Sequence, residues 1–289
     1  MNVIAGCLTE HGIKGLIEEC NSLAGDLYAI SLDVTKQESV DEAFAFVSNL
    51  MDEKNTTLWS VVNNAGINRF KGPSDWCEIK DFEDLIAVNL MGPIRVCQTF
   101  LPLLKKSKGR FVTMISCNGR VHNFYCAPYT TSKFGLEGYM ASLRVDMQIF
   151  GIGVSILEPG AFKTPLTQDS GLGDRINTVW NNLDKQVRQD YGVAFKDNLA
   201  MSYHRGVNTI ACDDLSKVVN CYVHAITAVS PKKRYVIGKD ASIIFIPLSY
   251  LSPSVQDKIL TLLFKRMAIT PAMHMKKSAV NALLSETAS

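Results

Sequence analysis

The chain has 289 residues, of which 47% are apolar and 20% are charged, and its formal net charge at pH 7 is +2. This length and apolar content predict one large α/β domain with a substantial core and leave little room for a second full domain. The balanced charge, without a basic segment interleaved with aromatic residues, argues against nucleic acid as a partner.

Strands and helices alternate from the start of the sequence. Apolar runs predict strands at Asn2–Leu8, Tyr28–Leu32 and Leu58–Val62, and helical spacing separates them at His11–Leu23 and Ser39–Leu50. Such alternation is typical of βαβ units and a parallel sheet. The third strand runs directly into the sequence Asn63-Asn64-Ala65-Gly66.

The same alternation continues through the second half. The predicted elements are a helix at Phe82–Leu104, a strand at Arg110–Ile115, a helix at Thr130–Phe150, a strand at Val154–Leu157, an irregular helical stretch at Thr167–Asn208, a helix at Asp213–Ala228 and a strand at Lys233–Ile237. The first of these helices contains Asn89 and Pro93, and Pro159-Gly160 ends the second strand.

Three polar residues converge on one predicted helix. Tyr129 precedes Lys133 by four positions, so the two side chains lie one turn apart on the same face. A nearby cation favours the phenolate and lowers the pKa of a tyrosine, which suits it for proton transfer. Ser116 follows a buried strand, and ligands of open α/β sheets bind at the carboxyl ends of strands. A hydroxyl there can hold a carbonyl or alcohol oxygen beside Tyr129.

The eight cysteines form no Cys-x-x-Cys pair and have no metal-ligand spacing with histidine. Reduced, buried thiols are therefore expected, and no metal site is predicted. No secretory signal opens the sequence, and the longest apolar run, Ala241 to Leu251, is too short to span a bilayer. We expect an intracellular protein.

Five signals, in order and spacing, resemble the short-chain dehydrogenase/reductase family. They are Asn63-Asn64-Ala65-Gly66, Asn89, Ser116, Tyr129-x-x-x-Lys133, and Glu158-Pro159-Gly160 followed by Thr164. Further motifs, such as Leu32-Asp33-Val34-Thr35 and Asp190-Tyr191-Gly192, are similar to those of the retinol and hydroxysteroid dehydrogenase branch, which includes the 3-hydroxybutyrate enzyme. The resemblance implies an oxidoreductase with a Rossmann-like, doubly wound parallel sheet.

The resemblance also marks a departure at the N-terminus. Family members begin with a strand, a glycine-rich turn for the dinucleotide pyrophosphate and a helix, and only then reach the strand that matches Asn2–Leu8. We therefore expect an N-terminally truncated sheet that lacks its first strand and first helix. Two arrangements stay open: the first two strands pair with Leu58–Val62 across the gap, or they keep unpaired edges. We expect a catalytic domain at 1–238, with a substrate lid at about 166–208, and a C-terminal extension at 239–289.

The resemblance assigns catalytic roles. Tyr129 is the general acid/base, Lys133 is the cation that lowers its pKa and hydrogen-bonds the nicotinamide ribose, and Ser116 binds the substrate oxygen. Asn89 corresponds to an asparagine that kinks its helix and holds a water in the proton relay. Bonding of Asn89 to nearby backbone is a compatible alternative.

The resemblance likewise assigns the cofactor site. Asn64, Ala65 and Gly66 line the adenine and ribose pocket, and Asp33 accepts from the adenine amino group. The nicotinamide is expected to contact Pro159, Gly160 and Thr164. NAD is expected because the branch mostly uses it, with NADP as the alternative, since Cys7-Leu8-Thr9 contains neither a selecting carboxylate nor an arginine.

Substrate contacts are expected in Asn118–Pro128 and Leu166–Arg205. An apolar lid over a steroid or retinoid alcohol or ketone is one interpretation, and packing of the lid's own core is the other; the residues concerned are Phe124, Tyr125, Phe162, Trp180, Phe195, Met201 and Tyr203. A small acid such as 3-hydroxybutyrate needs polar partners for its carboxylate, for which the candidates are His122, Asn123, Lys163 and Arg205.

The sequence leaves alternatives open for membrane contact, localisation, self-association and function. The tail from Ile243 to Met273 alternates apolar clusters with basic residues, which suits either peripheral contact with a membrane such as the endoplasmic reticulum or packing on the domain. If the anchor belongs to the missing N-terminal part, a cytoplasmic protein is expected. A homodimer would pair the catalytic helices around Tyr139 to Met147. The competing function is a non-catalytic, truncated product with impaired cofactor binding.

Overall fold

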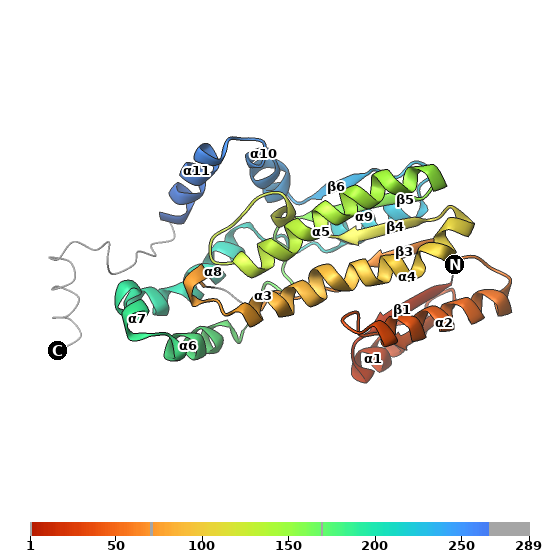
Figure 1. Ribbon diagram of the computed structural model, residues 1–289, viewed down its shortest axis with the longest axis horizontal. Helices are drawn as coiled ribbons and strands as arrows, with labels where there is room; N and C mark the ends of the chain where they lie inside the picture. Colours follow the sequence, from red (N-terminus) through yellow and green to blue (C-terminus); the bar gives the residue numbers. More distant parts are fainter. Residues whose placement is uncertain (1, 70–71, 169, 266–289) are drawn as a thin grey trace.

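A computed structural model describes residues 2–69, 72–168 and 170–265 (Figure 1). All the predicted strands are confirmed. They are β1 (Val3–Cys7), β2 (Leu27–Ser31), β3 (Ser60–Asn63), β4 (Arg110–Met114), β5 (Gly153–Pro159) and β6 (Arg234–Ile237). Every pairing between them is parallel, as the βαβ pattern predicts.

Helices connect the strands and cover the sheet. They are α1 (Glu10–Cys20), α2 (Gln37–Lys54), α3 (Ile79–Ile86), α4 (Gly92–Ser107), α5 (Ala127–Asp146), α6 (Leu172–Asn182), α7 (Lys185–Tyr191), α8 (Val193–Ile210), α9 (Ser216–Thr227), α10 (Ile246–Leu248) and α11 (Pro253–Lys265). A π-helical turn at Ala87–Met91 joins α3 to α4. Pro93 lies just after this turn, inside the continuous helical run Ile79–Ser107, where its missing N–H cannot donate to the preceding turn and favours a kink.

The strands form two sheets rather than one. The larger has the order β3-β4-β5-β6, and the smaller contains β1 and β2. Helices α4 and α5 cover one face of the larger sheet, while α9 contacts β4, β5 and β6 on the other (Figure 1). Pairing of the first two strands with β3 was therefore the wrong alternative. Within the described ranges, β1 and β3 each keep an edge without a neighbouring strand.

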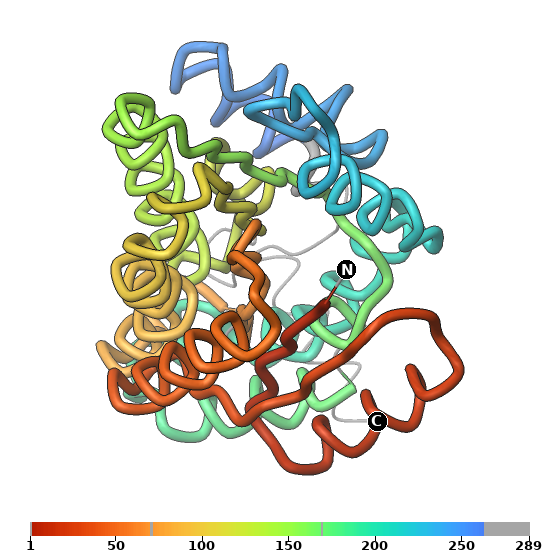
Figure 2. Tube along the Cα trace, turned by 90° about the vertical axis from the view of Figure 1, so that its right-hand side faces the viewer, coloured from red at the N-terminus to blue at the C-terminus, as the bar shows by residue number. Residues whose placement is uncertain are grey.

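Side-chain packing holds the small sheet to the rest of the molecule. The apolar face of α2, with Val40 and Val47, packs on Val96 and Phe100 of α4, and Ile30 of β2 joins this cluster. Figure 2 shows the β1–β2 layer on the side of the molecule opposite α10 and α11. Among the described residues, no strand joins the sheet of β1 and β2 to the sheet that begins at β3. That this gap results from a truncated sheet stays a prediction.

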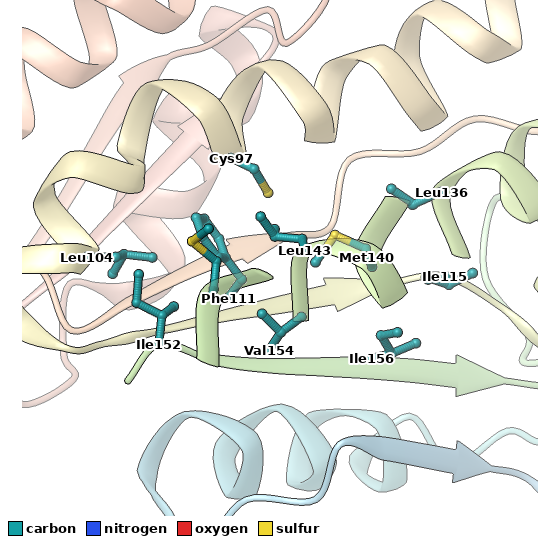
Figure 3. Close-up of a cluster of buried hydrophobic side chains, with 11 residues drawn as sticks. Cys97, Leu104, Phe111, Ile115, Leu136, Met140, Leu143, Ile152, Val154 and Ile156 are labelled. Carbon is teal, nitrogen blue, oxygen red and sulfur yellow. The ribbon is translucent and has the colours of Figure 1, made fainter. Parts of the chain in front are cut away.

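The main core lies between the larger sheet and helices α4 and α5. Phe111 and Ile156 are fully buried, and Met140 and Leu136 of α5 cover them (Figure 3). Burial of such side chains contributes about 1.5–3 kcal/mol each before entropy is counted. This packing fixes α5, and with it Tyr129 and Lys133, against the carboxyl end of β4.

The described part of the C-terminal segment packs on the domain. Ala241 and Ile246 contact Cys117, and Leu248 and Leu260 contact Val121. Both contacted residues lie in the stretch between Ser116 and Tyr129. Arg266, Lys276 and Lys277, which belong to the basic residues of the predicted tail, lie outside the described residues.

Candidate active site

Ser116, Tyr129 and Lys133 meet at one place. Ser116 follows β4, while Tyr129 and Lys133 lie one turn apart in α5. The Ser116 hydroxyl hydrogen-bonds the Tyr129 phenol, and Lys133 Nζ lies 5.7 Å from the centroid of the Tyr129 ring. The predicted convergence of hydroxyl, phenol and ammonium is therefore present in the structure. Their catalytic roles stay predictions.

Burial controls the pKa values of both helix residues, and here one expectation was wrong. Burial raises the pKa of Tyr129, although the Ser116 hydrogen bond opposes the shift. No lowering by Lys133 offsets this rise. Burial also disfavours the ammonium and lowers the pKa of Lys133 to about 8. Lys133 Nζ donates to the carbonyl oxygen of Met114 at 3.3 Å. At neutral pH Tyr129 is thus a protonated phenol, the form that donates a proton.

Replacing Lys133 by Met is expected to stabilise the folded protein at pH 7. Below pH 8 both the folded and the unfolded chain carry the Lys133 charge, so the folded state bears its full desolvation cost. Between pH 8 and 10.5 the unfolded chain binds more protons, and wild-type stability therefore rises with pH through this group. The free energy of unfolding of the variant should be higher by about 1–3 kcal/mol at pH 7 and should not increase through this group at higher pH. Urea unfolding at pH 7 and pH 9 measures both, and a less stable variant at pH 7 would contradict the expectation.

The three residues form one wall of a cavity of about 890 Å³. The cavity brings together eight of the residues predicted for the site: Asn64, Gly66, Ser116, Tyr129, Lys133, Pro159, Gly160 and Thr164. Asp33, Ala65 and Asn89 are not among its lining residues. Its size is that of a site for a drug-sized apolar molecule.

Asn89 binds backbone, which was the alternative to a water relay. Its side chain accepts from the Ile67 N–H at 2.8 Å and donates to the Ile67 carbonyl oxygen at 2.9 Å and to Ser132 Oγ at 3.0 Å. Asn89 is fully buried in the π-helical turn, which agrees with the predicted kink. Asn89 thereby ties the segment after β3 to α5.

Asp33 organises its own turn. Its carboxylate accepts from the Thr35 N–H at 2.9 Å and from the Thr35 hydroxyl at 2.6 Å, and these bonds hold its pKa below the ordinary value. Lys36 Nζ lies 3.7 Å from the other carboxylate oxygen. Binding of adenine by Asp33 stays a prediction, and these partners fit the alternative that Asp33 ends a strand.

The predicted lid residues divide into three groups. Phe124, Tyr125, Phe162 and Tyr203 line the cavity. Trp180 and Phe195 instead pack with Trp76 in the lid's own core, with ring centroids 5.4 Å and 5.7 Å from that of Trp76. Met201 is 53% exposed. For these last three residues, the apolar-lid interpretation was wrong.

The polar candidates for a small acid also divide. Asn123 and Arg205 line the cavity. Lys163 pairs with Asp213 at 2.5 Å, and His122 Nε2 lies 3.3 Å from Asp257. Among these four candidates, Arg205 is therefore the cavity cation that a carboxylate substrate could use.

Sequence reasoning missed several cavity residues. Tyr222 of α9 donates from its hydroxyl to Asn64 Oδ1 at 2.8 Å, and Ile244, Phe245 and Leu260 close the cavity from the C-terminal segment. None of them belongs to a local motif. From the sequence, these residues were predicted only to belong to a helix or to the C-terminal tail. Their position in the cavity depends on the folded path of the chain.

The residues present fit the nicotinamide half of a dinucleotide. Gly66 leaves space beside Lys133, because a Cβ added there would lie 3.7 Å from Lys133 Nζ. Pro159, Gly160 and Thr164 also line the cavity, and the Pro159 carbonyl oxygen lies 3.5 Å from Ser116 Oγ. For the pyrophosphate, the cavity lining within the described ranges contains no glycine-rich turn between a strand and a helix.

Comparison with known proteins decides the family. The model of the short chain dehydrogenase family matches residues 1–174. This protein belongs to the short-chain dehydrogenase family. Over 282 residues it is 43% identical to a 3β-hydroxysteroid dehydrogenase of Caenorhabditis elegans, a match covering 96% of this chain and 73% of the relative. It is also 39% identical to retinol dehydrogenase 5 of Mus musculus, covering 92% of this chain and 82% of that protein.

These relatives place the short-chain dehydrogenase in the retinol and hydroxysteroid dehydrogenase-like branch, as predicted. Solved structures agree on the fold. A short-chain dehydrogenase from Streptomyces avermitilis superimposes with a TM-score of 0.65 at 22% identity, over 91% of this chain and 86% of that one. The α/β fold and the prediction of an oxidoreductase are thereby confirmed.

Proposed function

We propose that this short-chain dehydrogenase interconverts an apolar secondary or allylic alcohol, of steroid or retinoid type, and its carbonyl compound. The observation that carries the proposal is the position of Ser116, Tyr129 and Lys133 on one wall of a cavity whose other walls are mostly apolar. The names of the relatives, which are hydroxysteroid and retinol dehydrogenases, support this substrate class.

Each residue of the wall has one task. A bound nicotinamide dinucleotide supplies or accepts the hydride. Ser116 holds the substrate oxygen with its hydroxyl, and Tyr129, next to it, exchanges the proton with that oxygen. The raised pKa of Tyr129 keeps this proton in place at neutral pH, which suits reduction of a carbonyl. Lys133 and the wall at Pro159, Gly160 and Thr164 orient the nicotinamide and its ribose. NAD is the proposed cofactor, with NADP as the alternative.

A fluorescence titration tests cofactor binding directly. Adding NADH, and separately NADPH, to the purified chain should give a saturable signal, with the lower dissociation constant for NADH. No saturable binding of either would favour the second candidate function, a non-catalytic protein. That candidate is favoured by one observation, the absence of a glycine-rich strand–helix turn among the described cavity residues.

Turnover separates substrate classes. With the preferred cofactor, a 3β-hydroxysteroid or all-trans-retinol should be oxidised with a kcat/KM at least about tenfold above that for 3-hydroxybutyrate, a difference of about 1.4 kcal/mol. Arg205 in the cavity is the feature that would favour the small acid. A preference for 3-hydroxybutyrate would contradict the proposal.

We also propose an intracellular location, peripheral membrane contact and a homodimer. Ile243 and Tyr250 of the C-terminal segment are 71% and 75% exposed, and Val145 and Ile149 at the end of α5 are 58% and 83% exposed. The helical run Ile79–Ser107 also has the length and hydropathy of a membrane span, a property shared by core helices. Flotation with phosphatidylcholine vesicles and sedimentation velocity measure the two associations.

A further inference from the structure

A buried carboxylate contacts the loop after β5 that lines the cavity. Asp240 follows β6 and precedes the π-helical turn Ala241–Phe245, and it is only 6% exposed. Its Oδ2 accepts a hydrogen bond from the Ala161 N–H at 2.6 Å. Such a short bond to a carboxylate is charge-assisted and roughly twice as strong as a neutral one.

The Asp240 carboxylate explains why glycines occupy positions 160 and 238. A Cβ added to Gly160 would lie 2.1 Å from Asp240 Oδ2, and one added to Gly238 would lie 2.6 Å from Oδ1. Gly238 also has a φ of +104°, a conformation that L side chains rarely adopt. The carboxylate therefore packs directly against the main chain of the loop after β5.

That loop is part of the site. Pro159, Gly160, Ala161 and Phe162 all line the cavity. The Pro159 carbonyl oxygen accepts from Ser116 Oγ at 3.5 Å. Main-chain bonds from Gly160 to Ile237, at 2.8 Å, and from Cys212 to Ala161, at 2.9 Å, hold the loop at its two sides. Asp240 adds a charged side-chain acceptor between them.

We propose that Asp240 is a positioning residue for this reaction. It holds the loop Pro159–Phe162, which would carry the nicotinamide contacts, in place beside Ser116, and the glycine at position 160 is needed because Asp240 occupies the space of its Cβ. The inference rests on the proposed function for its catalytic consequence. The tether, by which we mean the hydrogen bond from the Ala161 N–H to Asp240, does not depend on the proposed function.

The first experiment compares Asp240→Ala with Asp240→Asn. The alanine variant loses the acceptor for Ala161, so amide hydrogen exchange at Ala161 should accelerate by about 10- to 100-fold, whereas asparagine keeps an acceptor and should stay within about threefold of wild type. In turnover, Asp240→Ala should lower kcat by about 10- to 100-fold, because the displaced loop carries the expected nicotinamide contacts. The KM for the alcohol should stay within about threefold, because Phe162 is the one substrate-contact candidate in that loop. Asp240→Asn should recover most of kcat.

A double-mutant cycle supplies an independent measurement. Gly160→Ala alone should weaken NADH binding, because its Cβ collides with the Asp240 carboxylate. In the Asp240→Ala background the same Gly160→Ala change should weaken binding by a factor at least about fivefold smaller, since the collision is removed. Additive effects in the cycle would overturn the proposal, as would unchanged exchange at Ala161 in Asp240→Ala.

The outcomes separate the tether from the function. If the wild-type chain shows neither turnover nor NADH binding, the proposed function fails, and exchange at Ala161 still decides whether Asp240 holds the loop. If wild type is active and Asp240→Asn loses as much kcat as Asp240→Ala, the charge matters rather than the hydrogen bond to Ala161, and the positioning role is wrong.

Discussion

Replacing Tyr129 by Phe is expected to reduce kcat for the steroid or retinoid alcohol by about 10²- to 10⁴-fold, the usual contribution of a positioned acid/base. The substitution removes a single oxygen from a buried side chain in the cavity wall. The ring, which packs with Leu85 and Cys126, stays in place. The loss should therefore appear in kcat, with NADH binding and the urea midpoint close to those of the wild type.

The pH profile sharpens this expectation. Because burial raises the pKa of Tyr129, the phenol stays protonated through neutral pH, and carbonyl reduction should hold its rate from pH 6 to pH 8 in the wild type. Tyr28→Phe is a matched control, since Tyr28 lies in β2 and does not line the cavity. It should leave kcat within about twofold of wild type, in line with surface substitutions. A Tyr129→Phe enzyme with wild-type kcat would remove Tyr129 from the chemistry.

Whether a site residue could be predicted depended on its distance along the chain from its neighbours in the site. Ser116, Tyr129 and Lys133 were predictable because a strand end and one helical turn bring them together within 18 positions. The parallel pairing of β3 to β6 followed from the βαβ pattern in the same way. Asp240 was not predictable, because the chain needs about 80 residues to bring it back to Gly160, and no local motif marks it.

Environment was harder to predict than position. The sign of the pKa shift of Tyr129 was wrong because a sequence shows a neighbouring cation but not the burial that disfavours both charges. The same holds for the aromatic residues of the lid. Trp180 and Phe195 have the composition of a substrate pocket, yet Trp76, from a turn about 100 residues earlier, draws them into a separate core.

Replacing Arg234 by Met is expected to destabilise the protein by about 3 kcal/mol at pH 8, the lower end of the range for a broken buried ion pair. Arg234 donates from Nη1 to Glu158 at 2.9 Å and from Nη2 to Glu137 of α5. Glu158 is fully buried at the end of β5, next to Pro159. The pair thus ties the helix of Tyr129 to the loop that faces the cavity. Arg120 Nη1, 3.7 Å from the other Glu158 oxygen, remains in the variant and limits the loss.

The loss should depend on pH. Burial raises the pKa of Glu158, against the opposing effect of Arg234 and Arg120. For a carboxyl with a raised folded pKa, stability is fully present below the unfolded value, 4.5, and is lost as pH rises through the folded pKa. Without Arg234 that pKa rises further, so the destabilisation at pH 5 should be smaller than at pH 8.

Urea unfolding of three variants at pH 5 and pH 8 tests this account. In the Arg234→Met background, Glu158→Gln should recover about 1 kcal/mol or more at pH 8, because it removes the uncompensated charge. The control is Lys106→Met, which changes an exposed lysine in the last turn of α4 and should stay within about 0.5 kcal/mol of wild type. An equal loss at both pH values, or no recovery in the double variant, would mean that Arg234 stabilises this edge by packing of its side chain rather than by charge.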